Sequence, residues 1–297
     1  MRHLTIGTRG SALALRQVEL VTEAIRARDP SALIDTLIVQ TEGDRRSEVS
    51  LEEIGGQGVF VKDIEARLLR GEVDIAVHSL KDMPAEQPDG LTIAAVLPRA
   101  DARDALAARD GLDLAALPSG ARIGSDSARR AMQITALRPD VEVVSIRGNV
   151  DTRLRKVEAG EYDAAVLAVA GLQRLGLLER ATQVFTLREL LPAVGQGVLA
   201  VQCRTGDVEL VEYLAAVDDQ PTRIAAEAER AFLRALGAGC RLPVGAYATV
   251  DGESVRLEGL LGDEQGSPHR GDAQGPASAA QRLGAALAHR LRLEARV

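Results

Sequence analysis

Residues 4–28 read LTIGTRGSALALRQVELVTEAIRAR and show the alternation on which the fold prediction rests. Residues 4–7 form a short apolar run that predicts a buried strand. Ser11 is a typical helix N-cap, and apolar residues then recur with helical spacing up to residue 28, at Leu13, Val18, Val21 and Ile25. A strand that leads directly into an amphipathic helix is typical of an α/β sheet covered by helices.

The same alternation continues along most of the chain. Strands are predicted at residues 33–41, 73–77, 91–97, 121–124, 141–146, 164–169 and 198–202, and helices at residues 61–69, 128–137 and 150–158. Because strands that alternate with helices form parallel sheets, we predict parallel sheets. Residues 42–58 are polar and glycine-bearing without a clear period, and they predict a long mobile loop.

Two interruptions predict the domain organisation. The pattern restarts after residues 98–101 and breaks again at residues 192–197, which predicts two lobes joined by a hinge. The last part predicts a helix at 222–236, strands at 244–250 and 255–261, a Gly/Ser/Pro-rich loop at 263–276 and a terminal amphipathic helix. We therefore expect an α/β chain with domain 1 at 1–98 and 197–217, domain 2 at 102–193, and a smaller α+β domain 3 at 221–297.

Composition argues against several classes of protein. The formal net charge of −7, the aromatic content of 2% and the absence of Trp disfavour a nucleic-acid partner. The apolar runs are too short to span a bilayer, and the N-terminus lacks the apolar core of a signal peptide, so we expect a cytoplasmic protein without membrane contact. Two cysteines without a Cys-x-x-Cys pair allow neither a disulfide framework nor a thiol zinc site, and no metal is expected.

Three predicted strand-to-helix turns carry arginines. The first holds Arg9 and Ser11, the second spans residues 124–130, and the third spans residues 145–153. Free backbone N–H groups at such turns favour an anion, and parallel strands would bring the turns to one edge of a sheet. The turns therefore indicate a ligand with several negative groups. The alternative is that they are ordinary capped helices with solvated arginines, because three of the 36 cations are lysines and the rest are arginines.

Two further stretches hold reactive groups. Residues 77–84, VHSLKDMP, place His78, Ser79, Lys81 and Asp82 after a buried strand, where a carboxylate stabilises a cation or moves a proton. An ordinary solvated Lys–Asp pair and a structural histidine are the alternatives. Cys240 follows a helix end in the glycine-bearing stretch 237–243, which favours a reactive thiol, whereas Cys203 continues an apolar strand and is expected in the core.

The chain resembles the porphobilinogen deaminase family from Ile6 into the third domain. The resemblance is carried by VHSLKDMP at 77–84, RGNV at 147–150, LAVAGL at 167–172, PAVGQG at 192–197 and Gly239-Cys240. It implies two lobes similar to type II periplasmic binding proteins plus a cysteine-bearing domain. It also implies a monomeric transferase that joins four porphobilinogen molecules head to tail into hydroxymethylbilane, releases ammonia, and uses a dipyrromethane cofactor as primer in tetrapyrrole biosynthesis.

The resemblance also implies roles for individual residues. Asp82 matches the catalytic carboxylate, and Cys240 matches the cysteine that carries the cofactor as a thioether. The other implied cofactor-binding residues are Ser79, Lys81, Asp82, Ser125, Ser127, Arg129, Arg130 and Arg147. The implied substrate-binding residues are Arg9, Ser11, Phe60, Arg147, Arg153 and Arg174.

Five differences from the family pattern qualify these roles. Glu53 and Gln57 stand where the family has lysines, and Asp126 replaces a small hydroxyl residue. We expect Asp126 either to weaken cofactor binding or to pair with Arg129. Gln202 replaces the usual glutamate, and Ala238 replaces a glycine. The alternatives to an active enzyme are an impaired homologue, or a two-lobe binding protein that holds polycarboxylate pyrroles without turnover.

Overall fold

The computed structural model describes residues 2–41, 61–237 and 243–296. The chain divides into two compact units. The first unit comprises Met1–Arg99 and Val198–Arg223, and the second comprises Ala100–Gly197 and Ile224–Val297. No helix in the described ranges combines the length and the apolar character needed to cross a bilayer.

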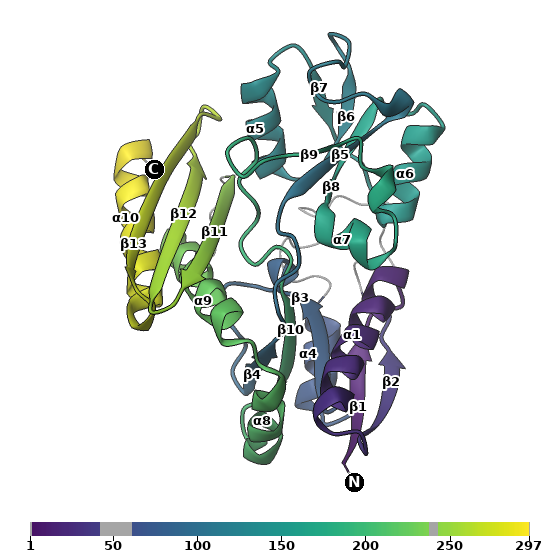
Figure 1. The fold of residues 1–297 in the computed structure, drawn as a ribbon, viewed down its shortest axis with the longest axis vertical. Helices are drawn as coiled ribbons and strands as arrows, with labels where there is room; N and C mark the ends of the chain where they lie inside the picture. The colour runs from purple at the N-terminus through teal and green to yellow at the C-terminus, as the bar shows by residue number, and fades with distance from the viewer. Residues whose placement is uncertain (1, 42–60, 238–242, 297) are drawn as a thin grey trace. The chain divides into compact units, whose positions relative to one another are not determined.

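The first unit contains a five-stranded sheet in the order β2-β1-β3-β10-β4 (Figure 1). Strand β1 is parallel to β2 and β3, but β10 is antiparallel to β3 and β4, so the expectation of a wholly parallel sheet is wrong. Leu199 pairs with Ser79, so the chain re-enters the sheet where β3 ends and has to run back along it. The strands are β1 (His3–Thr8), β2 (Leu33–Ile38), β3 (Ile75–Ser79), β4 (Leu91–Val96) and β10 (Leu199–Arg204).

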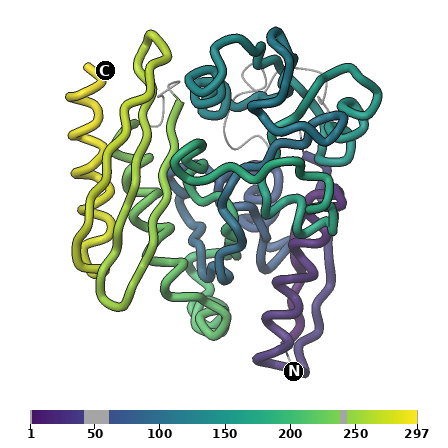
Figure 2. Tube along the Cα trace, turned by 45° about the horizontal axis from the view of Figure 1, so that its top comes forward, coloured from purple at the N-terminus to yellow at the C-terminus, as the bar shows by residue number. Residues whose placement is uncertain are grey.

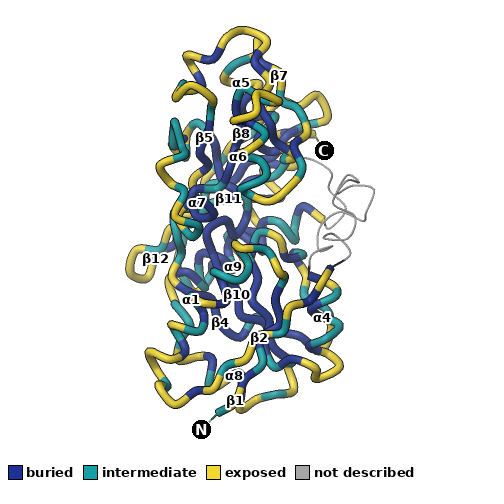
Figure 3. Tube along the Cα trace, turned by 90° about the vertical axis from the view of Figure 1, so that its right-hand side faces the viewer, coloured by how far each residue is buried: buried dark blue, intermediate teal, exposed yellow. Residues whose placement is uncertain are grey.

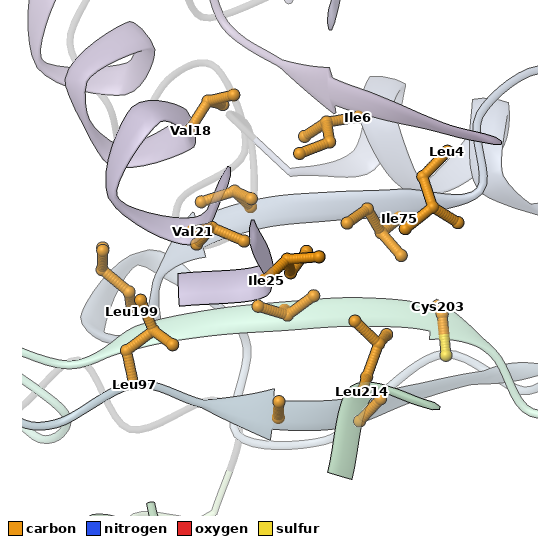
Figure 4. Packing of buried hydrophobic residues seen from close by; sticks show 14 of the residues in the cluster. Leu4, Ile6, Val18, Val21, Ile25, Ile75, Leu97, Leu199, Cys203 and Leu214 are labelled. Carbon is orange, nitrogen blue, oxygen red and sulfur yellow. The ribbon is translucent and has the colours of Figure 1, made fainter. Parts of the chain in front are cut away.

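Helices cover both faces of this sheet. Alternate residues of a strand face opposite sides. Ile75 and Val77 of β3 pack with α1, whereas Ala76 packs with α4. Figure 4 shows the α1 side, where Val18, Val21 and Ile25 meet the strands, and Figure 3 shows how thoroughly β10 is buried. The helices are α1 (Ala12–Arg28), α4 (Lys62–Leu69) and α8 (Val208–Leu214), with short 3-10 turns η1 (Leu80–Asp82) and η4 (Ala215–Val217).

The second unit contains another mixed sheet, in the order β7-β6-β8-β5-β9. β5 is antiparallel to β8, and the sequence analysis missed it because its sequence, DALAA, has low β-propensity. The strands are β5 (Asp104–Ala108), β6 (Arg122–Gly124), β7 (Glu142–Val144), β8 (Ala164–Ala168) and β9 (Gln183–Val184). The helices are α5 (Ala128–Leu137), α6 (Val150–Glu158) and α7 (Val169–Arg174), with 3-10 turns η2 (Arg109–Gly111) and η3 (Leu178–Arg180).

A three-stranded antiparallel sheet completes the second unit. Its strands are β11 (Val244–Asp251), β12 (Ser254–Gly262) and β13 (Pro268–Pro276), and it packs with α9 (Gln220–Leu236) and α10 (Ala280–Ala295), which follows the turn η5 (Ala277–Ala279). Figures 1 and 2 show α10 running along this sheet. The core between these helices and strands includes Phe232, Leu257 and Leu287.

The expected loop at 263–276 is wrong over most of its length, because residues 268–276 form β13. This strand pairs with β12 in continuous register and alternates exposed with half-buried positions. Its glycines, which suggested turns, serve close packing instead: a Cβ on Gly271 would lie 3.0 Å from Arg290 Nη2 and 3.1 Å from Leu291 Cδ2 of α10. Pairing with a neighbouring strand therefore outweighs the local turn signal.

Candidate functional site

The first unit has a cavity of about 70 Å³ at the carboxyl ends of β1 and β3, beside the first turns of α1. Four of the predicted site residues line it, namely Arg9, Ser11, Ser79 and Asp82. They come from two turns that are about 70 residues apart in the sequence. The parallel pairing of β1 with β3 brings these turns to one edge of the sheet. These four residues contribute a carboxylate, a guanidinium group and two of the three hydroxyl groups on the lining of this small space.

The two serine hydroxyl groups in this cavity are held by hydrogen bonds. Ser11 caps α1, and its Oγ accepts from the Ala14 N–H at 3.2 Å. Ser79 Oγ accepts from Gln17 Nε2 at 2.9 Å. Gln17 is buried and also lines the cavity, yet the sequence analysis did not select it, because a glutamine on an otherwise apolar helix face carries no motif.

One polar atom of the cavity is left unsatisfied. Thr8 Oγ1 is fully buried and has no hydrogen-bond partner among the described residues. An unpaired buried hydroxyl costs about 1–3 kcal/mol. Because Thr8 lines the cavity, a polar ligand atom placed there would recover that cost. This orphaned hydroxyl is therefore an observation, independent of any motif, that fits a polar ligand.

Of the other residues predicted for the site, Lys81 is described by the structure and several are not. Lys81 lies within η1, is half-buried and does not contribute to the cavity lining. Phe60, the expected loop 42–58 with Glu53 and Gln57, and the cysteine Cys240 lie outside the described residues.

The second unit holds Arg129 and Arg130 in a buried ion-pair cluster. Arg129 Nη2 lies 2.9 Å from Asp104 Oδ2, and Arg130 Nη2 lies 2.6 Å from Asp104 Oδ1. Burial alone would raise the pKa of Asp104, but the two guanidinium groups outweigh burial and hold that pKa well below its ordinary value. Two buried cations share one carboxylate, so the cluster carries an excess of positive charge. The sequence analysis missed Asp104 because an aspartate in an alanine-rich stretch gives no local signal.

Asp126 connects the two arginine-bearing turns of the second unit. Its Oδ1 accepts from Ser145 Oγ at 2.5 Å and from the Ile146 N–H at 3.2 Å, and its Oδ2 lies 3.6 Å from Arg153 Nη2. The expected pairing of Asp126 with Arg129 is therefore wrong, because Asp104 and the Leu191 carbonyl already engage Arg129. Asp126 instead balances part of the charge of Arg153.

The other predicted residues of this unit lie around the same sheet. Ser125 and Ser127 follow β6, and Ser127 Oγ caps α5 by accepting from the Arg130 N–H at 3.4 Å. Arg147 and Arg153 follow β7, which is parallel to β6, so these turns share an edge. Arg174 ends α7 and donates to the Gly197 carbonyl at 2.8 Å, and burial lowers its pKa to about 10.

Cys203 is a core residue, as expected. It is fully buried beside Leu4, Ile75 and Leu214 (Figure 4). Burial raises the pKa of its thiol to about 11, so the thiolate is scarcely populated at neutral pH.

Comparisons with known proteins cover nearly the whole chain. A family model described as "Porphobilinogen deaminase, dipyromethane cofactor binding domain" matches residues 4–212, and one described as "Porphobilinogen deaminase, C-terminal domain" matches residues 223–292. The porphobilinogen deaminase of Roseiflexus castenholzii is 49% identical over 97% of this chain and 95% of the relative. That of Brevibacillus brevis is 48% identical over 88% and 85%, and that of Sorangium cellulosum is 46% identical over 97% and 98%. Among solved structures, the methionine binding protein MetQ is 11% identical over 72% of this chain and 89% of that chain, with a TM-score of 0.46.

Proposed function

The chain belongs to the porphobilinogen deaminase family, and on this premise we propose how its residues perform the reaction. The protein is a transferase of porphyrin biosynthesis that polymerises porphobilinogen into hydroxymethylbilane and has a dipyrromethane cofactor. Each addition breaks the C–N bond of an aminomethyl group, releases ammonia, and forms a C–C bond to a pyrrole carbon, which then loses its proton. The cavity lined by Asp82 is the observation that carries the assignments of Arg9, Ser11, Ser79 and Asp82, and the other assignments follow the family resemblance.

The residues present fit a polycarboxylate pyrrole. Thr8 Oγ1 is an unpaired buried hydroxyl in the cavity, and the buried cluster around Asp104 has more cations than anions. When bound, the dipyrromethane supplies the free pyrrole position at which the product chain grows. We assign its covalent attachment to Cys240, and its carboxylates and pyrrole nitrogens to Ser79, Lys81, Asp82, Ser125, Ser127, Arg129, Arg130 and Arg147. Substrate binding is assigned to Arg9, Ser11, Phe60, Arg147, Arg153 and Arg174.

Asp82 is assigned the catalytic role. Asp82 lines the cavity together with Ser79 and Arg9. A fixed anion there stabilises the positive charge that develops as ammonia leaves, and it accepts the proton that the pyrrole carbon loses.

The localisation, the oligomeric state and the domain boundaries are also assigned from the family resemblance. We propose a cytoplasmic monomer with domain 1 at 1–98 and 197–217, domain 2 at 102–193 and domain 3 at 221–297. The family matches do not favour the alternative of an impaired homologue, which was suggested by Glu53 and Gln57 in place of cations and by the contact of Asp126 with Arg153. Release of ammonia from porphobilinogen by the purified protein supports the active enzyme, and binding without release supports the impaired homologue.

The intact mass of the denatured protein tests the cofactor attachment. We expect wild type to carry an adduct equal to two condensed pyrrole units, and we expect the Cys240→Ser variant to lack it. Cys203→Ser is the matched control and should retain the adduct, because the Cys203 thiol is buried with its pKa raised to about 11. An adduct that disappears with Cys203 and persists without Cys240 would overturn the assignment.

Removal of the Asp126 carboxylate should remove one competitor of a substrate carboxylate for Arg153, whose Nε also donates to the Gly148 carbonyl. We expect Asp126→Ser to lower the KM for porphobilinogen by about two- to fivefold, the range of one partly exposed ion pair. Initial rates of ammonia release over a range of substrate concentrations give the KM. The matched control is Asp151→Ser, which removes an acid from the first turn of α6, the helix that contains Arg153. Equal KM values for wild type and Asp126→Ser would show that the Asp126–Arg153 pair does not limit binding.

A further inference from the structure

A buried polar network lies against the cavity of the first unit. His78 of β3 approaches Gln202 of β10, with His78 Nε2 3.2 Å from Gln202 Oε1. Gln202 Nε2 donates to Glu65 Oε1 of α4 at 2.9 Å and to Gln87 Oε1 at 2.8 Å. His78, Gln202 and Glu65 are all buried. The proposed reaction assigns no role to any of these side chains.

The hydrogen bonds of Gln202 determine which nitrogen of His78 carries the proton. A glutamine amide has two N–H donors, and both are used here, toward Glu65 and Gln87. The opposite amide orientation would place the Gln202 oxygen against both Glu65 Oε1 and Gln87 Oε1. Burial raises the pKa of Glu65, but donation from Gln202 opposes this shift and favours the ionised carboxylate, which only accepts. Gln202 Oε1 therefore faces His78 and accepts, so His78 Nε2 is the donor.

The second ring nitrogen of His78 is consequently an acceptor. Burial lowers the pKa of His78 to about 4, although its hydrogen bond with Gln202 opposes this shift, so the ring is neutral at neutral pH. A neutral ring with its proton on Nε2 has a lone pair on Nδ1. Nδ1 makes no hydrogen bond with residues in the described part of the chain. His78 lines the same cavity as Ser79 and Asp82.

We propose that His78 contacts the ligand in this cavity, with Nδ1 accepting a hydrogen bond from an N–H group of the pyrrole substrate or chain. Gln202 is the positioning residue, because it fixes the ring in the tautomer that leaves Nδ1 unprotonated. Glu65 and Gln87 in turn fix the orientation of the Gln202 amide. The chemical identity of the ligand rests on the proposed function, whereas the tautomer rests on the network alone.

Two substitutions at His78 separate this role from a structural one. An asparagine amide reaches about the position of Nδ1, and a glutamine amide reaches about the position of Nε2. His78→Asn thus keeps a polar atom at the ligand side, and His78→Gln keeps the contact with Gln202. We expect kcat/KM to fall about 10- to 100-fold in His78→Gln, and we expect His78→Asn to be at least tenfold more active than His78→Gln. His78→Asn should also have the lower Tm of the two, since it loses the buried contact.

Ammonia release and thermal unfolding are measured for both variants with the cofactor loading checked by mass. The reverse order of activities, or equal activities, would overturn the role of His78 in ligand contact. Failure of the wild type to release ammonia would overturn the proposed function instead, so the two failures are distinguishable.

Nitrogen-15 NMR of the histidine rings gives an independent readout. A protonated Nε2 and an unprotonated Nδ1 are expected for the resonance that His78→Gln removes. A protonated Nδ1 in wild type would overturn the proposal whatever the activity.

Discussion

Replacing Asp82 with asparagine should lower kcat by about 10²- to 10³-fold, the usual effect of removing one preorganised electrostatic group. The amide keeps the shape of the side chain but neither carries the negative charge nor accepts the proton. Because Asp82 is exposed at the end of η1, the substitution should leave the free energy of unfolding nearly unchanged. Ammonia release under saturating porphobilinogen measures kcat, and urea unfolding measures stability.

Asp89 provides the matched control for this experiment. It is an exposed aspartate a few residues further along the same segment, and it does not line the cavity. Asp89→Asn should therefore match the wild type in both kcat and stability. If Asp82→Asn turned over at the wild-type rate, the catalytic role would have to pass to another group.

Replacing Asp104 with asparagine should produce the largest loss of stability. Asp104 is fully buried, and the substitution leaves Arg129 and Arg130 buried without their carboxylate. Breaking a buried ion pair by removing one partner typically costs about 3–5 kcal/mol. The free energy of unfolding, measured by urea titration at neutral pH, should fall by an amount of this order.

The pH dependence and a surface pair provide the checks on this prediction. The pKa of Asp104 is lower in the folded protein than in the unfolded chain, so its contribution is present above the unfolded pKa and fades as the pH falls toward the folded pKa. The difference in the free energy of unfolding between wild type and Asp104→Asn should therefore shrink only in strong acid.

A surface ion pair provides the matched control. Asp140→Asn breaks the surface pair with Arg138 and should lower the free energy of unfolding far less. Similar losses for the two variants would contradict the importance of burial.

Local signals explain what the sequence predicted well. Helix α1 begins and ends where expected because its cap at Ser11 and its apolar spacing are both contained within the helix. The cavity residues Arg9, Ser11, Ser79 and Asp82 were found because each belongs to a contiguous motif next to a strand end. The prediction is less accurate for Leu13, which was expected on the buried face of α1. Leu13 is only half-buried, because it lies beside the cavity.

Long-range contacts explain what the sequence did not predict. The direction of β10 depends on where the chain re-enters the sheet, and β13 depends on pairing with β12. The partners of Asp104 and Asp126 lie about 20 to 30 residues away along the chain. Gln17 and Gln202 are polar residues on buried faces, and their roles are visible only once their partners Ser79 and His78 are in place.

The late arrival of β10 has a consequence for synthesis of the protein on the ribosome. β10 lies between β3 and β4, and β4 pairs with no other strand in the described structure. β4 ends at Val96 and β10 begins at Leu199, so roughly 100 residues are translated between them. At about 5–20 residues per second, the edges of β3 and β4 stay open for roughly 5–20 seconds. Unpaired strand edges promote aggregation, so the nascent chain is in most need of a chaperone during this interval.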